Sequence, residues 1–91
     1  MFIYIMAQQA DFKGNSFVKV GISEAPERRR LQLQIGNPVP IKIVKTVKVT
    51  NREEAEVTEK LIHDLLKDCS LHGEWFFCKV ERAIGTVEAL F

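Results

Sequence analysis

The sequence predicts a single small domain, residues 1–91, of the α/β class in its α+β form. A chain of this length builds one core and buries roughly 60–65% of its unfolded surface. Three segments have strand character, at residues 2–7, 17–22 and 40–50. Three have helical spacing, at residues 26–35, from a cap at 50 or 51 to about 69, and at 80–90. These elements predict a small sheet with helices packed on it.

The first two strands are expected to pair as an antiparallel hairpin. Phe2–Ala7 is apolar throughout, whereas in Phe17–Ile22 two valines alternate with Lys19. The polar connection holds the turn-forming pair Gly14-Asn15. The hairpin brings Tyr4 and Lys19 to neighbouring strands, but only the register decides whether they share a face.

The third strand alternates apolar and basic residues. The apolar odd positions, expected on one buried face, are Ile41, Ile43, Val47 and Val49. Lys42 and Lys48 are expected on the opposite face. Lys45 falls on the apolar side, which predicts a β-bulge or a lysine at the rim of the sheet.

Helix 26–35 begins with the wrong charges for stability. Pro26 suits the first helical position, and Arg28, Arg29 and Arg30 follow in the first turn. Each exposed cation at the positive end of a helix costs about 0.3–1 kcal/mol. Either these arginines only extend into solvent, or at least one helps to bind an anion such as phosphate. Leu31 and Ile35 are expected to face the core.

The second helix is the clearest element. Thr50 or Asn51 caps it, and a glutamate follows three residues later in a capping-box pattern. The expected core face consists of Ala55, Thr58, Ile62, Leu65, Leu66 and Cys69. Glu59 lies at the border of this face, with His63 one turn further. The pair is either a weak surface interaction or part of a cleft.

The net charge of +1 conceals an asymmetry. Residues 1–50 carry a formal charge of +5 and residues 51–91 carry −4. A basic half suggests a surface that faces a polyanion. The sequence has no apolar run long enough to span a membrane, and its two cysteines come without an export signal. We therefore expect a cytoplasmic protein with free thiols and no membrane partner.

Four side chains supply the chemistry of phosphodiester hydrolysis: the phenol of Tyr4, the ammonium of Lys19, one guanidinium among Arg28–Arg30, and the carboxylate of Glu59. A carboxylate can hold Mg²⁺, and a cation can balance the charge that develops on phosphate. An ammonium beside a phenol is expected to lower the pKa of that phenol.

In order and spacing, the motifs resemble those of the GIY-YIG endonuclease superfamily, in its small phage-type branch. The matching segments are Phe2-Ile3-Tyr4 or Ile3-Tyr4-Ile5, Lys19-Val20-Gly21, Pro26-Glu27-Arg28-Arg29 with Gly36-Asn37-Pro38, Glu59-x3-His63, and Gly73-Glu74-Trp75-Phe76. The resemblance covers roughly residues 2–77. In the first motif, Phe2 stands where glycine is usual, and no residue matches the late asparagine of the superfamily.

The resemblance implies a three-stranded, mostly antiparallel sheet flanked by three helices, and hydrolysis of DNA with Mg²⁺ or Mn²⁺. It implies that Tyr4, helped by Lys19, is the base or orients water, and that Arg29 binds the scissile phosphate. Glu59 would hold the metal, and His63 would carry protons or support the site. Glu74 is expected to be structural. The cations expected to contact the DNA backbone are Arg28, Arg30, Lys42, Lys45 and Lys48.

Two other interpretations stay open. The first is a non-catalytic module that binds DNA or a protein partner on the same fold, favoured by the modest net charge and the missing asparagine. The second is a protein–protein adaptor, which requires Trp75, Phe76 and Phe77 to be exposed. We expect these three aromatic side chains to be mostly buried. The sequence indicates no oligomeric state.

Overall fold

The structure, a computed structural model, describes all 91 residues and has the expected α+β class. Its elements are β1 (Phe2–Ala7), β2 (Asn15–Ser23), α1 (Pro26–Gln34), β3 (Lys42–Lys48), α2 (Arg52–Leu65), the 3-10 turn η1 (Lys67–Cys69), β4 (Trp75–Lys79) and α3 (Val80–Glu88). The strands form one sheet in the order β3-β1-β2-β4, with every neighbouring pair antiparallel. The expectation of three strands is wrong, because the aromatic segment that enters the core does so as the edge strand β4.

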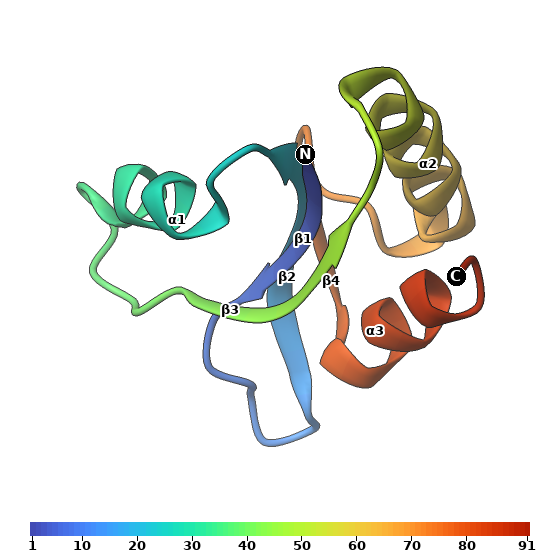
Figure 1. Cartoon of the computed structure of the whole chain (residues 1–91). Coiled ribbons are helices and arrows are strands. Elements are labelled where there is room, and N and C mark those ends of the chain that lie inside the picture. Colours follow the sequence, from blue (N-terminus) through green and yellow to red (C-terminus); the bar gives the residue numbers. More distant parts are fainter.

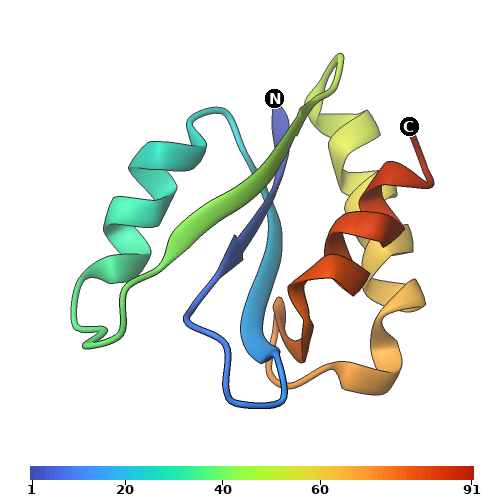
Figure 2. The same ribbon diagram turned by 90° about the horizontal axis from the view of Figure 1, so that it is seen from below.

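The helices cover both faces of the sheet. Helix α1 packs on one face, and α2 and α3 pack together on the other (Figures 1 and 2). Strand β1 lies between β3 and β2, so five of its six residues are buried. Successive side chains along a strand point to opposite faces, and β1 therefore contributes to two separate cores.

The larger core lies between the sheet and the α2–α3 pair. It contains alternate residues of β1 and β2 together with buried residues of both helices, among them Ile5, Val20, Ile62, Phe76 and Val87. The helical spacing expected in α3 is confirmed, since Ala83 and Val87 are buried. On α2, Ala55, Ile62 and Leu66 are fully buried, but Leu65 is exposed, contrary to expectation.

The smaller core lies under α1 and consists of Tyr4, Met6 and Ile41 with partly buried neighbours such as Leu33. Leu31 and Ile35 are exposed, so the expectation that they face the core is wrong. Helix α1 buries no residue completely.

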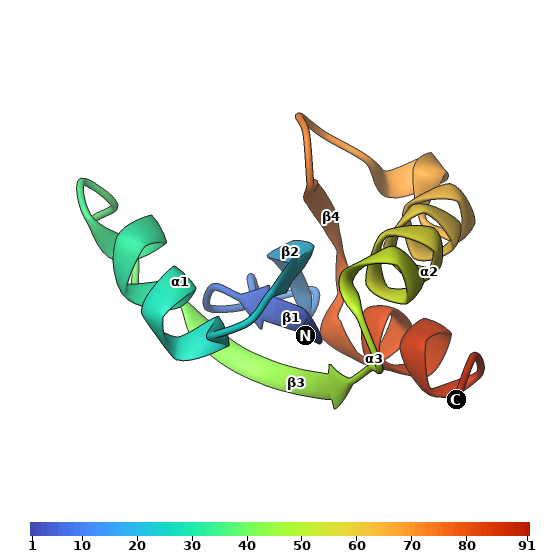
Figure 3. The ribbon, with the colours of Figure 1, turned by 45° about the horizontal axis from the view of Figure 1, so that its top comes forward.

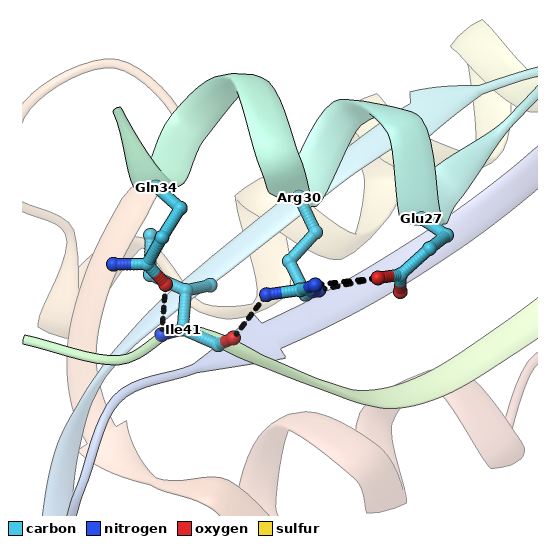
Figure 4. A network of polar contacts seen from close by, with 4 residues as sticks. All are labelled: Glu27, Arg30, Gln34 and Ile41. Carbon is cyan, nitrogen blue, oxygen red and sulfur yellow. Dashed lines mark hydrogen bonds and ion pairs between the residues drawn. The ribbon is translucent and has the colours of Figure 1, made fainter.

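Helix α1 is attached to the chain before β3 largely through polar contacts (Figure 4). The side-chain oxygen of Gln34 accepts a hydrogen bond from the backbone N–H of Ile41 at 2.8 Å. The guanidinium of Arg30 donates to the carbonyl of Ile41 at 3.4 Å and pairs with Glu27. Arg30 therefore connects α1 to the residue that directly precedes β3.

The irregularity expected around Lys45 is confirmed as a register shift. Ile5 pairs with Lys45, whereas Met6 pairs with Ile43, so Val44 is an extra residue on β3. This bulge reverses the faces along the strand. Ile43 belongs to the core under α1, and Val47 packs against the larger core. The expectation that the odd residues of β3 share one face is therefore wrong.

Local signals fix the ends of several elements. The side chain of Asn51 accepts a hydrogen bond from the N–H of Glu54, and the Glu54 carboxylate accepts one from the N–H of Thr50, the residue before the N-cap, so the helix start is a variant of the expected capping box. Gly36 has a φ of 76° after α1, a conformation that glycine adopts readily. No helix of the chain is both long enough and apolar enough to cross a membrane.

The aromatic residues of β4 have different environments. Phe76 is buried, Trp75 is partly buried and Phe77 is exposed, with its ring packed at a tilt against that of Phe17 at 5.1 Å between ring centres. The expectation that all three are mostly buried holds for Phe76, whereas Phe77 contradicts it. Of these three residues, only Phe77 offers the exposed aromatic surface that the adaptor interpretation requires.

Candidate functional site at the open edge of β2

The site lies where β2 continues past the end of its neighbour. The pairing of β2 with β4 ends at Lys19 opposite Trp75, followed by one hydrogen bond from the N–H of Val20 to the carbonyl of Glu74. Residues 21–23 of β2 therefore have no strand on that side. Helix α2 and the turn that leads into β4 both lie beside this edge (Figure 3). Side chains from four elements can reach the same stretch of backbone.

Tyr4 and Gly21 are directly opposite in the β1–β2 register. A Cβ added to Gly21 would collide with the Tyr4 hydroxyl, and would lie 2.6 Å from Tyr4 Cζ and 3.0 Å from Glu74 Oε2. Glycine is therefore needed because the phenol and a carboxylate both pack against this backbone. The motif segments around Tyr4 and Gly21 meet in one place, as the sequence suggested.

Lys19 points to the same face as Tyr4. Its side chain is only 8% exposed, and its Nζ lies 3.2 Å from Glu74 Oε2. The ammonium also lies 5.3 Å from the centre of the Trp75 ring, within the range of a cation–π interaction. A buried ammonium requires such partners, because loss of its hydration shell is costly.

Glu59 reaches this edge from α2. Its Oε2 atom is buried and has no hydrogen-bond partner. Burial raises the pKa of Glu59, and the negative charge of Glu74 raises it further, although His63 and Lys19 act in the opposite direction. A buried carboxylate oxygen without a partner lowers stability, so this atom is available to a ligand.

His63 lies one turn beyond Glu59 and closes the edge of β2. Its Nε2 lies 2.8 Å from the carbonyl oxygen of Val20. A carbonyl only accepts hydrogen bonds, so Nε2 carries a proton in this contact, which leaves Nδ1 unengaged by Val20. The ring also packs edge-on against Phe76 at 5.1 Å.

Arg29 approaches Tyr4 from α1. The guanidinium acts to lower the pKa of the Tyr4 phenol, but burial outweighs it, and the charges of Glu74 and Glu59 also act to raise that pKa. The pKa of Tyr4 is therefore raised above its ordinary value of 10.0. The expectation that a neighbouring ammonium lowers it is wrong, because Lys19 is paired with Glu74 and Tyr4 is only 1% exposed.

The five cations expected to contact DNA are scattered. Arg28 is exposed beside Arg29, and Arg30 is engaged in the contacts that hold α1. Lys45 pairs with Ile5 and points toward α3, where it forms an ion pair with Glu88 at 3.6 Å. Lys42 lies on that same side, beside Val80, so neither lysine joins the site. Lys48 follows the bulge and shares the face of Tyr4 at the end of β3.

Glu74 is the site residue that sequence reasoning missed. It was expected to be structural, yet its carboxylate lies between Lys19 and Gly21 and affects the pKa of both Tyr4 and Glu59. The sequence does contain a signal, because Glu74 directly precedes the aromatic segment Trp75–Lys79. That position brings Glu74 beside Lys19 only if the aromatic segment pairs with β2.

The donor set suits one divalent cation with few protein ligands. No cluster of three or more His, Cys, Asp or Glu side chains is present, but Glu59 has an unpartnered buried oxygen and the carboxylate of Glu74 is near it. Two carboxylates in mutual repulsion are the type of oxygen ligand that Mg²⁺ and Mn²⁺ prefer. The residues present therefore fit such an ion.

The fold and the site together define a small α+β domain with a polar, partly buried site at one edge of its sheet. The chain belongs to the T5orf172 domain family, whose model matches residues 1–91. This match corrects the expected membership of the GIY-YIG superfamily, because the T5orf172 domain is a distinct family. The T5orf172 domain is found in nuclease-associated phage and bacterial proteins, which agrees with a DNA-related role. No curated protein and no solved structure matches the chain significantly.

Proposed function

We propose that this chain is a metal-dependent endonuclease that hydrolyses phosphodiester bonds in DNA. The observation that carries this proposal is the buried, unpartnered Oε2 of Glu59, which lies beside a second carboxylate and near a lysine and a phenol, the phenol being also in contact with Arg29. A chain selected for stability alone would not keep an unsatisfied charged oxygen next to a like charge. The occurrence of the family in nuclease-associated proteins supports the same conclusion.

The cations of the site would bind the substrate. Arg29 would donate to the oxygens of the scissile phosphate, since a guanidinium can form two parallel hydrogen bonds with one phosphate. Lys19 lies deeper, and its ammonium would be shared between Glu74 and the developing negative charge. Both cations are already positioned by the fold, so little reorganisation is needed during the reaction.

Tyr4 and His63 would have complementary roles. The raised pKa keeps Tyr4 a neutral phenol near pH 7, so it would donate a hydrogen bond to a phosphate oxygen or to the attacking water. The neutral ring of His63 offers Nδ1 as a proton acceptor, because Nε2 is engaged by Val20. The task of accepting a proton therefore falls to His63 or Glu59 rather than to Tyr4.

Glu59 and Glu74 would hold Mg²⁺ or Mn²⁺. When bound, the ion would stabilise negative charge on the phosphate as a Lewis acid. Glu59 would supply the oxygen that has no partner within the chain. Glu74 would lose part of its interaction with Lys19 and leave that ammonium free to face the phosphate.

A plasmid-relaxation assay tests the proposal. Supercoiled DNA is incubated with Mg²⁺ or Mn²⁺ and with the wild-type chain, Glu59→Gln, or Glu53→Gln as a matched control on the exposed surface of the same helix. We expect the wild-type chain and Glu53→Gln to nick the plasmid, and Glu59→Gln to be at least about 100-fold slower, the scale of losing one catalytic group. Equal nicking by all three proteins would contradict the proposal.

The ion pair between Lys19 and Glu74 favours one other candidate, a non-catalytic DNA-binding or partner-binding module. The pair neutralises the ammonium and gives Lys19 a structural role. This candidate predicts DNA retention without nicking by the wild-type chain at any concentration of metal ion. The same plasmid incubation, followed by a gel-shift measurement, separates the two candidates.

A further inference from the structure

A second polar hollow adjoins the site at the far end of β2. Its volume is about 460 Å³, and it lies between the first turn of α1 and the first turn of α2. The side chains that decide its character are Ser23, Glu24, Arg28, Arg29 and Arg52. Three of them are guanidinium groups and only one is a carboxylate, so the hollow has an excess of positive charge.

The guanidinium groups of this hollow are largely uncommitted. Arg28 forms no ion pair, and Arg29 forms none either: it makes a long contact of 3.4 Å with Gln32 and acts on the Tyr4 phenol. Arg52 pairs with Glu56 at 2.9 Å, but both side chains are more than half exposed. An exposed pair within one helix is worth only a few tenths of a kcal/mol, so Arg52 can turn to another anion.

The hollow is continuous with the candidate site. Arg29 lines the hollow and also acts on the Tyr4 phenol. Ser23 lies two residues beyond Gly21 on the same face of β2, a distance of about 6.6 Å along a strand. A nucleic-acid strand that places one phosphate at Arg29 therefore extends naturally toward Arg28 or back toward Lys19.

We propose that Arg28 and Arg52 form a second phosphate-binding subsite, which holds the DNA backbone phosphate next to the phosphodiester bond at Tyr4 and Arg29. The inference rests on the proposed function, because it takes the same DNA strand as the ligand. It assigns to substrate binding Arg52, a residue that no sequence pattern indicated. Two phosphates held at neighbouring points fix the direction of the strand across β2.

The test measures binding of a short DNA duplex by the cleavage-blocked Glu59→Gln chain in EDTA, over a series of salt concentrations. Arg28→Gln and Arg52→Gln are added singly and together. The control is Arg82→Gln, an arginine of α3 that pairs with Asp68 on the other side of the sheet. Thermal unfolding of each protein checks that the fold is kept.

We expect each of Arg28→Gln and Arg52→Gln to weaken binding several-fold and to reduce the slope of log K against log salt by about one. Arg82→Gln should leave the slope unchanged. The subsite would be overturned if Arg28→Gln, Arg52→Gln and the double variant all had the same slope as the parent chain, or if the parent chain did not bind the duplex. If the arginine variants reduce the slope but the wild-type chain never cuts DNA, the phosphate-binding subsite is supported and the proposed nuclease activity is refuted.

Discussion

The hydroxyl end of the Tyr4 phenol lies against the backbone of Gly21 on the neighbouring strand, and only the absence of a Cβ permits this contact. The relationship connects the fold to the site, because the same backbone also receives the carboxylate of Glu74. A side chain at position 21 would displace both groups.

Gly21→Ala is expected to lower the free energy of unfolding by about 1–3 kcal/mol, the usual cost of overpacking. Gly85→Ala is the matched control, since nothing lies within 4 Å of a Cβ added to this helical glycine. That control should gain about 0.5–1 kcal/mol from helix propensity. Urea unfolding monitored by circular dichroism measures both. Similar values for the two variants would show that Tyr4 does not pack on Gly21.

Tyr4 is expected to ionise only above its ordinary pKa of 10.0, because the folded structure buries the phenol. The chain has one tyrosine, so tyrosinate absorbance reports this group alone. The stabilising contribution of the neutral phenol is present below pH 10 and is lost as the pH rises through the folded-state pKa. A titration midpoint below 10 would support Tyr4 as the base and contradict its role as a hydrogen-bond donor.

Removing the charge of Glu74 should lower the pKa of Glu59. Burial is the largest cause of the raised pKa of Glu59, and the negative charge of the Glu74 carboxylate is the second largest. Carbon-13 NMR titration of the glutamate carboxyls compares the wild-type chain with Glu74→Gln, and Glu81→Gln on α3 serves as the control. An unchanged titration of Glu59 in Glu74→Gln would mean that the two carboxylates are not neighbours.

The attachment of α1 should depend on Gln34. Its side-chain oxygen accepts a hydrogen bond from the N–H of Ile41, and the helix buries no residue completely. Gln34→Ala is expected to cost about 1 kcal/mol and to increase amide hydrogen exchange across α1 more than across α2. The control is Gln32→Ala, which changes an exposed glutamine of the same helix. Equal exchange in both variants would assign the attachment of α1 to Leu33 and its apolar neighbours instead.

The sequence predicted the elements better than their pairing. Caps at Asn51 and Gly36 and the apolar spacing of α3 are local signals, and the structure confirms them. The fourth strand was missed because Trp75–Lys79 reads as core-filling aromatic sequence until its partner β2 is known. Local patterns do not encode which strand a short edge segment will join.

The same reason explains the partial prediction of the site. Residue type and order predict Tyr4, Lys19, Glu59 and one arginine among Arg28–Arg30, whereas Arg29 itself is predicted only by the family resemblance. The structure brings Tyr4 and Glu74 against Gly21, with Lys19, Arg29 and Glu59 around them. Glu74 was underrated because its role depends on β4. Lys42 and Lys45 lie on the other face of the sheet: Lys45 by ordinary alternation along β3, and Lys42 because the extra residue reverses the faces before it.

The most direct test is to measure, on one preparation of Glu59→Gln, both DNA nicking and thermal stability at neutral pH. Burial and Glu74 raise the folded-state pKa of Glu59, so the folded state favours the protonated carboxyl. The stability that this preference contributes is fully present below pH 4.5 and is lost as the pH rises through the folded-state pKa. Glu59→Gln removes this loss, so we expect a higher unfolding free energy than that of the wild-type chain, together with nicking reduced at least about 100-fold. A variant that is less stable than the wild-type chain, or that nicks DNA at the wild-type rate, would contradict the account.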